Sequence, residues 1–474
     1  MKPVAGRRPI GEQLAGWVPM NMEETLQLAR FVSQLAYEDL PAEVIEKTKD
    51  LILDQIGCQV AGATMPWSKA VYEYVRDYKG PREESTVVNY GLKTTAQDAA
   101  FANACFGNAF LGDDTDSVCH AHLGAIIIPS ALAAGEMEGI SGEAFLKAVV
   151  AGYEVSSRVG AAAKNAEARG YHPGPLFGPF GAAACAGSIL GLDEKGILNA
   201  LGIAGSQSSG LMEYSRSGGN VNRVHAGIAA YSGIRAALLA QRGFSGPATI
   251  LEGERGFVNA FSGECDIEAM TRDLGREFRT QQIDLKTHCC CGTSGAYLDA
   301  VAMIMEKQKV DPKGIEAISV YVTPPAYRLT GAITKPKDIT SAQFGGRFGI
   351  ALRLIKGGNS FREYSEQNLQ DRNVLDLESK TEMIIDENLE KLPGSDCPAR
   401  VVIKMANGAA YDETVRAPKG SVLNPMMKGE VHKKFREFAV AALPGERMAS
   451  LLNKVSGLDT VQNIRELSRL LSVM

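Results

Sequence analysis

Apolar residues in the first 280 positions recur mostly at the three- and four-residue spacing of amphipathic helices. The stretch from Met22 to Tyr37 shows this pattern with Leu28, Phe31, Val32 and Leu35. A second apolar face follows Pro41, and a long helix is predicted from Ser141, whose side chain can cap its N-terminus, to Ala163. The pattern predicts a helical domain whose many Gly and Ala residues allow its helices to pack closely.

The hydrophobic pattern changes near residue 284. Ala317–Thr323 is rich in β-branched residues and alternates as a strand does. Arg400–Met405 and Ala409–Val415 flank Asn407-Gly408, a strong hairpin signal. After Pro425 helical spacing returns, and these last helices are too few to bury a core of their own. We therefore predict a mostly α protein, with a large all-helical domain formed by both chain ends and a smaller α+β domain.

These changes of pattern divide the chain into four predicted segments. Residues 1–20 are predicted to be a flexible N-terminal extension, since they lack the apolar stretch of a signal peptide. Residues 21–283 are the first part of the helical domain, residues 284–420 the α+β domain, and residues 421–474 the second part of the helical domain. No repeat of 20 to 50 residues indicates a solenoid.

Composition narrows the possible functions of the 474-residue chain. The net charge is −5, with acidic and basic residues interspersed and no basic cluster of the kind that nucleic-acid-binding proteins carry. No apolar run reaches the roughly 18 residues of a membrane span. The nine cysteines are odd in number, and three of them are consecutive at positions 289–291, which does not suit a disulfide framework. We therefore expect a cytoplasmic protein that binds neither nucleic acid nor a membrane.

A polar segment between two Ala-rich helical stretches carries most of the candidate chemistry. It contains Asp113, Asp114 and Thr115, and His122 follows them closely. A polar loop between apolar helices is costly to keep unless it has a use. We interpret it as the floor of an active site for proton transfer. The alternative is that Asp113 and Thr115 only cap the following helix.

Two further histidines stand where glycine or proline breaks the backbone pattern. His172 lies at the entry of the segment Pro173–Pro179, which is predicted to be an irregular loop, and His225 lies just before Gly227. An imidazole has an ordinary pKa of about 6.5, so it can take or give a proton at neutral pH. Histidines such as these can remove a proton alpha to a carboxylate. The alternative is that they are ordinary core or surface residues.

Candidate anion-binding residues occur in two more segments. Arg216 and Arg223 flank a Gly-rich stretch before a predicted helix, where guanidinium groups and backbone N–H groups could hold a carboxylate or phosphate. The alternative is a solvated loop. The second segment contains Lys286, His288 and Thr293 around the run Cys289–Cys291. Consecutive cysteines converge poorly on one ion, so no metal site is predicted there.

The order and spacing of many short segments resemble the MmgE/PrpD family, which includes 2-methylcitrate dehydratase, cis-aconitate decarboxylase and iminodisuccinate epimerase. No one segment is decisive, but together they are specific and span nearly the whole chain. In chain order they are Leu53–Cys58, Asp113–Thr115, His122–Ala125, Gly152–Glu154, Gly170–Pro173, Leu190–Asp193, Gly205–Gly210, His225–Ala230, Gly243–Pro247, Leu251–Gly256, Ala342–Phe344 and Asn424–Pro425.

The resemblance implies a homodimer in which the α+β domain forms a lid over a cofactor-free site between the domains. It also implies that the family's acid/base and substrate-holding residues fall on Thr115, His122 and His172. The chain departs from the family pattern at several positions. Leu111 replaces an Asp, Asn222 replaces a Lys beside Arg223, and Thr293 lies near the place of a His, with His288 five residues upstream. One extra residue also separates Thr115 from His122.

The leading hypothesis is a cofactor-independent lyase, a dehydratase or decarboxylase, acting on a small carboxylated substrate. His122 and His172 would transfer the proton, and Asp114 and Thr115 would orient them. The candidate substrate-binding residues are Asp113, Arg216, Arg223, His225, Lys286, His288 and Thr293. An epimerase or isomerase of the same family is one alternative, because two histidines from separate loops could serve both faces of a carbon. The other is a catalytically silent member that acts as a binding or structural protein.

Overall fold

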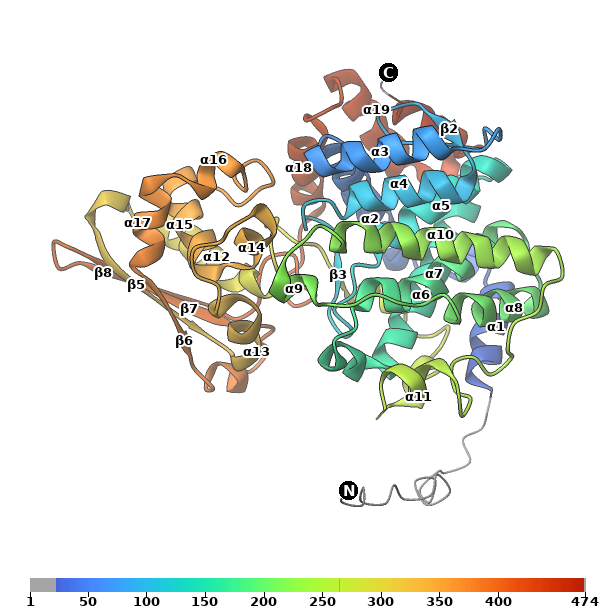
Figure 1. The fold of residues 1–474 in the computed structure, drawn as a ribbon, viewed down its shortest axis with the longest axis horizontal. Helices are drawn as coiled ribbons and strands as arrows, with labels where there is room; N and C mark the ends of the chain where they lie inside the picture. The colour runs from blue at the N-terminus through green and yellow to red at the C-terminus, as the bar shows by residue number, and fades with distance from the viewer. Residues whose placement is uncertain (1–22, 264, 473–474) are drawn as a thin grey trace, which may run out of the picture.

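The computed structural model describes residues 23–263 and 265–472. The predicted N-terminal extension lies outside these residues. The first half is helical, as predicted (Figure 1). Its α-helices are α1 (Glu24–Gln34), α2 (Ala42–Gly62), α3 (Pro66–Tyr78), α4 (Ala96–Gly107), α5 (Gly124–Glu138), α6 (Gly142–Ala162), α7 (Pro173–Ile189), α8 (Glu194–Gly205), α9 (Tyr214–Ser217), α10 (Asn222–Gln241) and α11 (Phe257–Phe261).

Helix α7 lies at the centre of this helical part and packs against α5, α6, α8 and α10. Small residues allow the close approach. A Cβ atom added to Gly233 of α10 would lie 2.3 Å from the Cβ atom of Ala182 in α7, so only glycine fits there. Ser141 caps α6 by accepting a hydrogen bond from the backbone N–H of Ala144, as the sequence predicted. Among the described residues, none of the helices has the length and apolar character needed to cross a membrane.

The prediction of an irregular loop at Pro173–Pro179 is wrong, because these residues form the first turns of α7. Pro173 stands at the start of the helix, where no intrahelical N–H bond is lost. Pro179 lies inside it, and proline cannot donate to the carbonyl of Pro175 four residues earlier. The backbone N–H of Ser209 donates to that carbonyl instead, at 3.3 Å. His172 therefore precedes a helix, on the residue that serves as its N-cap.

The second part of the chain forms a small mixed sheet covered by short helices, on the left in Figure 1. The strand order is β6-β5-β7-β8, in which β5 and β6 are parallel and the other pairs antiparallel. The predicted hairpin is confirmed, with Lys404 opposite Ala410 and Gly408 at a φ of 89°. The strands are β5 (Ile315–Val322), β6 (Thr381–Ile385), β7 (Ala399–Met405) and β8 (Ala410–Val415), and the principal helices are α12 (Gly295–Lys307), α13 (Pro324–Ala326), α14 (Ile339–Phe344), α15 (Gly346–Lys356), α16 (Glu366–Leu369) and α17 (Arg372–Ser379).

The last three helices return to the first half of the chain, which confirms that both chain ends build the helical part. They are α18 (Lys428–Ala439), α19 (Gly445–Ser456) and α20 (Arg465–Leu470). Helices α18 and α19 pack on α2, and α20 packs on α5. A buried ion pair joins the ends, since Lys434 Nζ of α18 lies 2.6 Å from Asp54 Oδ1 of α2. The domain boundaries at residues 283 and 420 stay predictions.

Candidate active site

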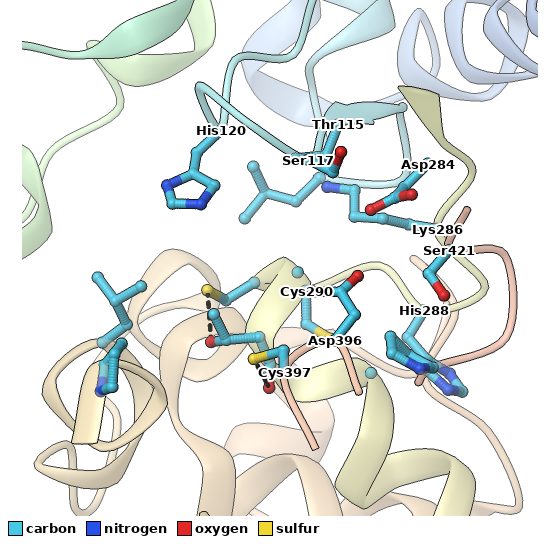
Figure 2. A pocket seen from close by; sticks show the side chains of 18 of the residues that line it. Thr115, Ser117, His120, Asp284, Lys286, His288, Cys290, Asp396, Cys397 and Ser421 are labelled. Carbon is cyan, nitrogen blue, oxygen red and sulfur yellow. Dashed lines mark hydrogen bonds between the residues drawn. The ribbon is translucent and has the colours of Figure 1, made fainter. Parts of the chain in front are cut away.

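A cavity of about 530 Å³ opens between the helical part and the α+β part. Its walls combine residues from both, so neither part forms it alone. Figure 2 shows the wall that carries Thr115, Lys286 and Asp284 facing the wall that carries Cys290 and Cys397. The volume is within the roughly 300–1,000 Å³ typical of small-molecule sites.

The segment from Thr115 to His122 folds back on itself. Its first two residues form β3 (Thr115–Asp116), which pairs with β4 (Ile283–Asp284). The side chain of Asp116 holds the turn by accepting hydrogen bonds from the backbone N–H groups of Val118 and Cys119. The return of the chain brings His122 beside Thr115, and both line the cavity.

The contacts of His122 determine which of its nitrogen atoms is available. Nδ1 lies 2.7 Å from the backbone oxygen of Asp114 and 3.3 Å from Oγ1 of Thr115. A carbonyl oxygen only accepts, so Nδ1 carries the hydrogen in the neutral ring and Nε2 keeps its lone pair. The pKa of His122 is lowered, first by burial and then by the charge of Lys286. His122 is thus a neutral imidazole with its basic nitrogen Nε2 unused by this hydrogen bond.

The backbone oxygen of Asp114 orients His122, whereas the Asp114 side chain forms hydrogen bonds elsewhere. One carboxylate oxygen accepts from the Tyr153 hydroxyl at 2.6 Å, and the other accepts from the backbone N–H of Gly124 at 2.9 Å. These bonds fix the start of α5, and the Asp114 side chain does not line the cavity. Burial raises the pKa of Asp114 to about 7.

Asp113 and Lys286 form a second buried unit next to His122. Asp113 Oδ2 accepts from Asn108 Nδ2 at 2.7 Å and lies 3.8 Å from His122 Nδ1. Lys286 Nζ lies 3.7 Å from Asp113 Oδ1, which is an ion pair without a hydrogen bond. No hydrogen-bond partner for this buried ammonium occurs in the part of the chain that the structure describes. An ammonium has three donors, so Lys286 can bind an anion in the cavity that it lines.

His172 reaches the same cavity from the start of α7, with His225 of α10 behind it. Their Nδ1 atoms are 2.8 Å apart, and the ring of Tyr214 packs edge-on against His172. Burial lowers the pKa of His172 well below its ordinary value, and positive charge on His225 or His122 would lower it further. His172 is therefore neutral at pH 7 in this structure. His225 is not among the residues that line it.

The remaining candidates divide into two groups. His288 and Thr293 line the cavity, and His288 Nε2 lies 2.9 Å from Asp299 Oδ1. Arg223 does not line it. Its guanidinium stacks on Trp67, 3.9 Å from the ring centroid, and donates to Thr340 Oγ1 and to the carbonyl oxygen of Ala109. The Arg223 charge thus has other partners. The side chain of Arg216 lies outside the described residues.

Several cavity residues were missed by the sequence reasoning, most notably Asp284 and Asp396. All five residues of Asp284–His288 line the cavity, including Leu285 and Thr287, so no alternating pattern marks Asp284. Its place two residues before Lys286 is the one sequence signal that could have suggested it. Asp396 gave no comparable signal, since its neighbours are the irregular residues before β7. Among residues 23–263 and 265–472, no three His, Cys, Asp or Glu side chains are grouped as metal ligands.

Comparison with known proteins places the chain in a family. Residues 26–270 match the model of the MmgE/PrpD N-terminal domain, and residues 288–458 match that of the MmgE/PrpD C-terminal domain. The chain belongs to the MmgE/PrpD family. Both matches together include every cavity residue named above except Asp284 and Lys286, which lie between them.

Curated relatives of this MmgE/PrpD protein cover nearly its whole length. A cis-aconitate decarboxylase-like protein, oryM, of Aspergillus oryzae is 31% identical over 471 residues, which cover 94% of this chain and 97% of the relative. A cis-aconitate decarboxylase of Aspergillus terreus is 29% identical, covering 94% and 96%. The cis-aconitate decarboxylase of Homo sapiens is 24% identical, covering 94% of each chain.

Proposed function

We propose that this protein is a cofactor-independent lyase that decarboxylates a small unsaturated acid with two or more carboxylates, and that cis-aconitate is the first substrate to test. The observation that carries the proposal is the buried Lys286 ammonium, without a hydrogen-bond partner in the described structure, in the cavity that His122 and His172 also line. Relatives whose names give this activity match over 94% of the chain, which supports the choice of reaction.

The reaction requires a carboxylate to leave as CO2 from a carbon next to a C=C bond. The C–C bond to that carboxylate breaks, its electron pair forms a new double bond, and the old double bond's pair takes a proton at its far carbon. One proton is consumed for each CO2 released. Lys286 would hold a carboxylate that stays on the substrate. His122 Nε2 and His172 are the first candidates for the proton transfer.

The buried environment of the histidines suits a polyanionic substrate. In the empty cavity burial keeps His172 neutral by lowering its pKa. Each carboxylate that enters brings negative charge, which raises the pKa of a neighbouring imidazole. Substrate binding would therefore load the site with a proton taken from solvent. Calorimetric titration with an unreactive tricarboxylate, in buffers of different ionisation enthalpy, would measure this uptake.

The proposal is tested by offering the protein a panel of di- and tricarboxylic acids in deuterated water. We expect release of CO2 and incorporation of one deuteron per product molecule, seen in the proton NMR spectrum as the loss of one proton's intensity at the carbon that is protonated. His122→Gln and His172→Gln should each lower the rate of CO2 release by at least about 100-fold. Arg235→Gln, on the exposed side of α10, is the matched control and should keep the wild-type rate. A wild-type protein that releases no CO2 from any acid of the panel contradicts the proposal.

An epimerase is the second candidate, because His122 and His172 approach one cavity from separate elements. Two bases on opposite faces of a carbon can remove a proton and return it on the other side. The same NMR experiment distinguishes the two functions. Deuterium exchange at a carbon alpha to a carboxylate, without CO2 release, would favour the epimerase. Neither exchange nor binding of any acid would favour the silent family member.

The assembly of the protein is a separate proposal. We infer a homodimer from the family resemblance alone, with the α+β part acting as a lid over each cavity. Light scattering coupled to size-exclusion chromatography measures the mass directly. A mass near 51 kDa, that of one 50.6 kDa chain, would contradict the dimer.

A further inference from the structure

Asp284 occupies a place in the cavity that the histidine chemistry does not explain. It ends β4, directly opposite Thr115 of β3, so its backbone is fixed by the pairing that also positions the His122 segment. It lies two residues before Lys286, and both line the cavity. Figure 2 shows Asp284 on one wall with Thr115, Ser117 and Lys286. The substrate carboxylate that Lys286 would hold therefore lies within the part of the cavity that Asp284 faces.

The carboxyl group of Asp284 is anchored but carries no cation. Oδ1 accepts a hydrogen bond from the backbone N–H of Val422 at 2.8 Å, which fixes the orientation of the group. None of the ion pairs in the described part of the chain includes Asp284. Lys47 of α2, whose charge acts on Asp284, donates its hydrogen bond to the carbonyl oxygen of Ile283 at 2.6 Å instead. A partly buried carboxyl group without a counter-ion favours its protonated form.

The charges around Asp284 act in the same direction. Burial raises its pKa to about 7, and the carboxylates of Asp396 and Asp116 add to the rise, against the hydrogen bond from Val422 and the charge of Lys47. Asp396 lies before β7, and its own pKa is raised by burial. The pKa values of His122 and His172 are shifted the opposite way. At neutral pH the cavity thus offers neutral imidazoles and a carboxyl group that is protonated in a substantial fraction of the molecules.

We propose that Asp284 is the proton donor of the decarboxylation, placed by β4 beside Lys286 and opposite Thr115. This inference rests on the proposed function and assigns the proton donation to Asp284 in place of the two histidines named there as first candidates. As the C–CO2 bond breaks, the substrate carbon takes the proton of the Asp284 carboxyl group, and the resulting carboxylate regains a proton from water. Neutral His172 can then bind a substrate carboxylate by donating a hydrogen bond from Nε2, when His225 donates between the two Nδ1 atoms. Neutral His122 has no N–H left for the substrate, because its hydrogen lies on Nδ1 toward the Asp114 carbonyl oxygen, and its Nε2 can only accept.

The test compares Asp284→Asn with the wild-type enzyme. Asparagine keeps an oxygen that can accept from Val422 but cannot donate a proton as an acid. We expect kcat to fall at least about 100-fold, with KM within about threefold. The wild-type activity should fall as the pH rises through about 7, and this pH dependence should be absent from the remaining rate of Asp284→Asn. Asp284→Glu, which restores an acid, should restore this pH dependence.

Asp396→Asn is the matched control, since it removes a neighbouring carboxylate from the same cavity. It should move the pH dependence of kcat to lower pH, because Asp396 is one cause of the raised pKa of Asp284. If Asp284→Asn does not fold, the pH dependence of kcat in Asp396→Asn still tests the proposal. A pH profile of Asp396→Asn that is the same as that of the wild type overturns it. An Asp284→Asn enzyme that keeps its kcat, or loses kcat but keeps the wild-type pH dependence, also overturns it. A wild-type protein without any CO2 release overturns both this inference and the proposed function.

Discussion

His172 and His225 face each other through their Nδ1 atoms, which lie 2.8 Å apart. A hydrogen bond between these atoms needs a hydrogen on one Nδ1 and a lone pair on the other. When His225 donates, a neutral His172 carries its hydrogen on Nε2 and can donate to a substrate. When His172 donates, its Nε2 has the lone pair and can act as a base. His225 therefore determines which role His172 can take, although it does not line the cavity.

This relationship predicts the effect of His225→Ala. Without the partner the His172 ring loses the hydrogen bond that sets its tautomer, and a neighbouring imidazole whose positive charge would lower its pKa is removed. We expect kcat to fall about tenfold or more and the imidazole pKa of His172 to rise. Steady-state kinetics and NMR titration of labelled histidine would measure both. His432→Ala, on α18, is the control for removing a histidine. An unchanged His172 titration would show that the two rings are not coupled.

Lys286→Met tests the anion-binding role of the buried ammonium. The substitution keeps a flexible side chain of similar length but removes the charge. A hydrogen bond to a charged group contributes about 1.5–3 kcal/mol, so KM for the carboxylated substrate should rise about 10- to 100-fold. Lys309→Met, at an exposed position of the α+β part, should leave KM unchanged. A Lys286→Met enzyme with the wild-type KM would remove Lys286 from substrate binding.

The fold was largely predictable because hydrophobic periodicity reports which face of an element is buried. The α6 cap at Ser141, the Asn407-Gly408 hairpin and the return of the C-terminal helices all follow local rules. The prediction failed at Pro173–Pro179, where the sequence shows two prolines and gives no sign that Ser209 satisfies the carbonyl of Pro175. A compensating contact 30 or more residues away is invisible to local pattern.

The candidate site was predictable to a lesser degree, since a sequence names residue types but does not orient them. His122, His172 and Lys286 do line one cavity. Arg223, adjacent to Asn222 at the place of the family lysine, points instead to Trp67 and Thr340. The direction of the Arg223 side chain depends on the packing of α10 against α4 and on contacts with the α+β part. Both are contacts between residues far apart in the sequence. The place of Asp284, two residues before Lys286, was present in the sequence and was overlooked.

The buried pair of Lys434 and Asp54 predicts a strong effect on stability. Lys434 also donates to the carbonyl oxygen of Gly112 at 2.8 Å, so it joins α18, α2 and the polar segment before β3. Lys434→Met leaves the Asp54 carboxylate buried without its cation, which typically costs about 3–5 kcal/mol of unfolding free energy. Lys433→Met, at its exposed neighbour, should cost less than about 0.5 kcal/mol. Urea unfolding would measure the difference, and equal midpoints for the two variants would contradict it.

Asp284→Asn should stabilise the folded protein at high pH. The pKa of Asp284 rises from 3.8 to about 7 on folding, so its contribution to stability is complete below pH 3.8 and is lost as the pH rises through about 7. Asparagine has no proton to lose and keeps an acceptor for the Val422 N–H. A pKa shift of this size corresponds to roughly 4 kcal/mol of unfolding free energy. We expect Asp284→Asn to gain about 1–2 kcal/mol at pH 8, because the side chain is only partly buried and solvent screens its charge. Urea unfolding at pH 8 and pH 5 measures the gain, which should shrink at the lower pH. A variant less stable than the wild type at pH 8 would show that Asp284 holds its charge without penalty, and the proton-donor assignment would lose its physical basis.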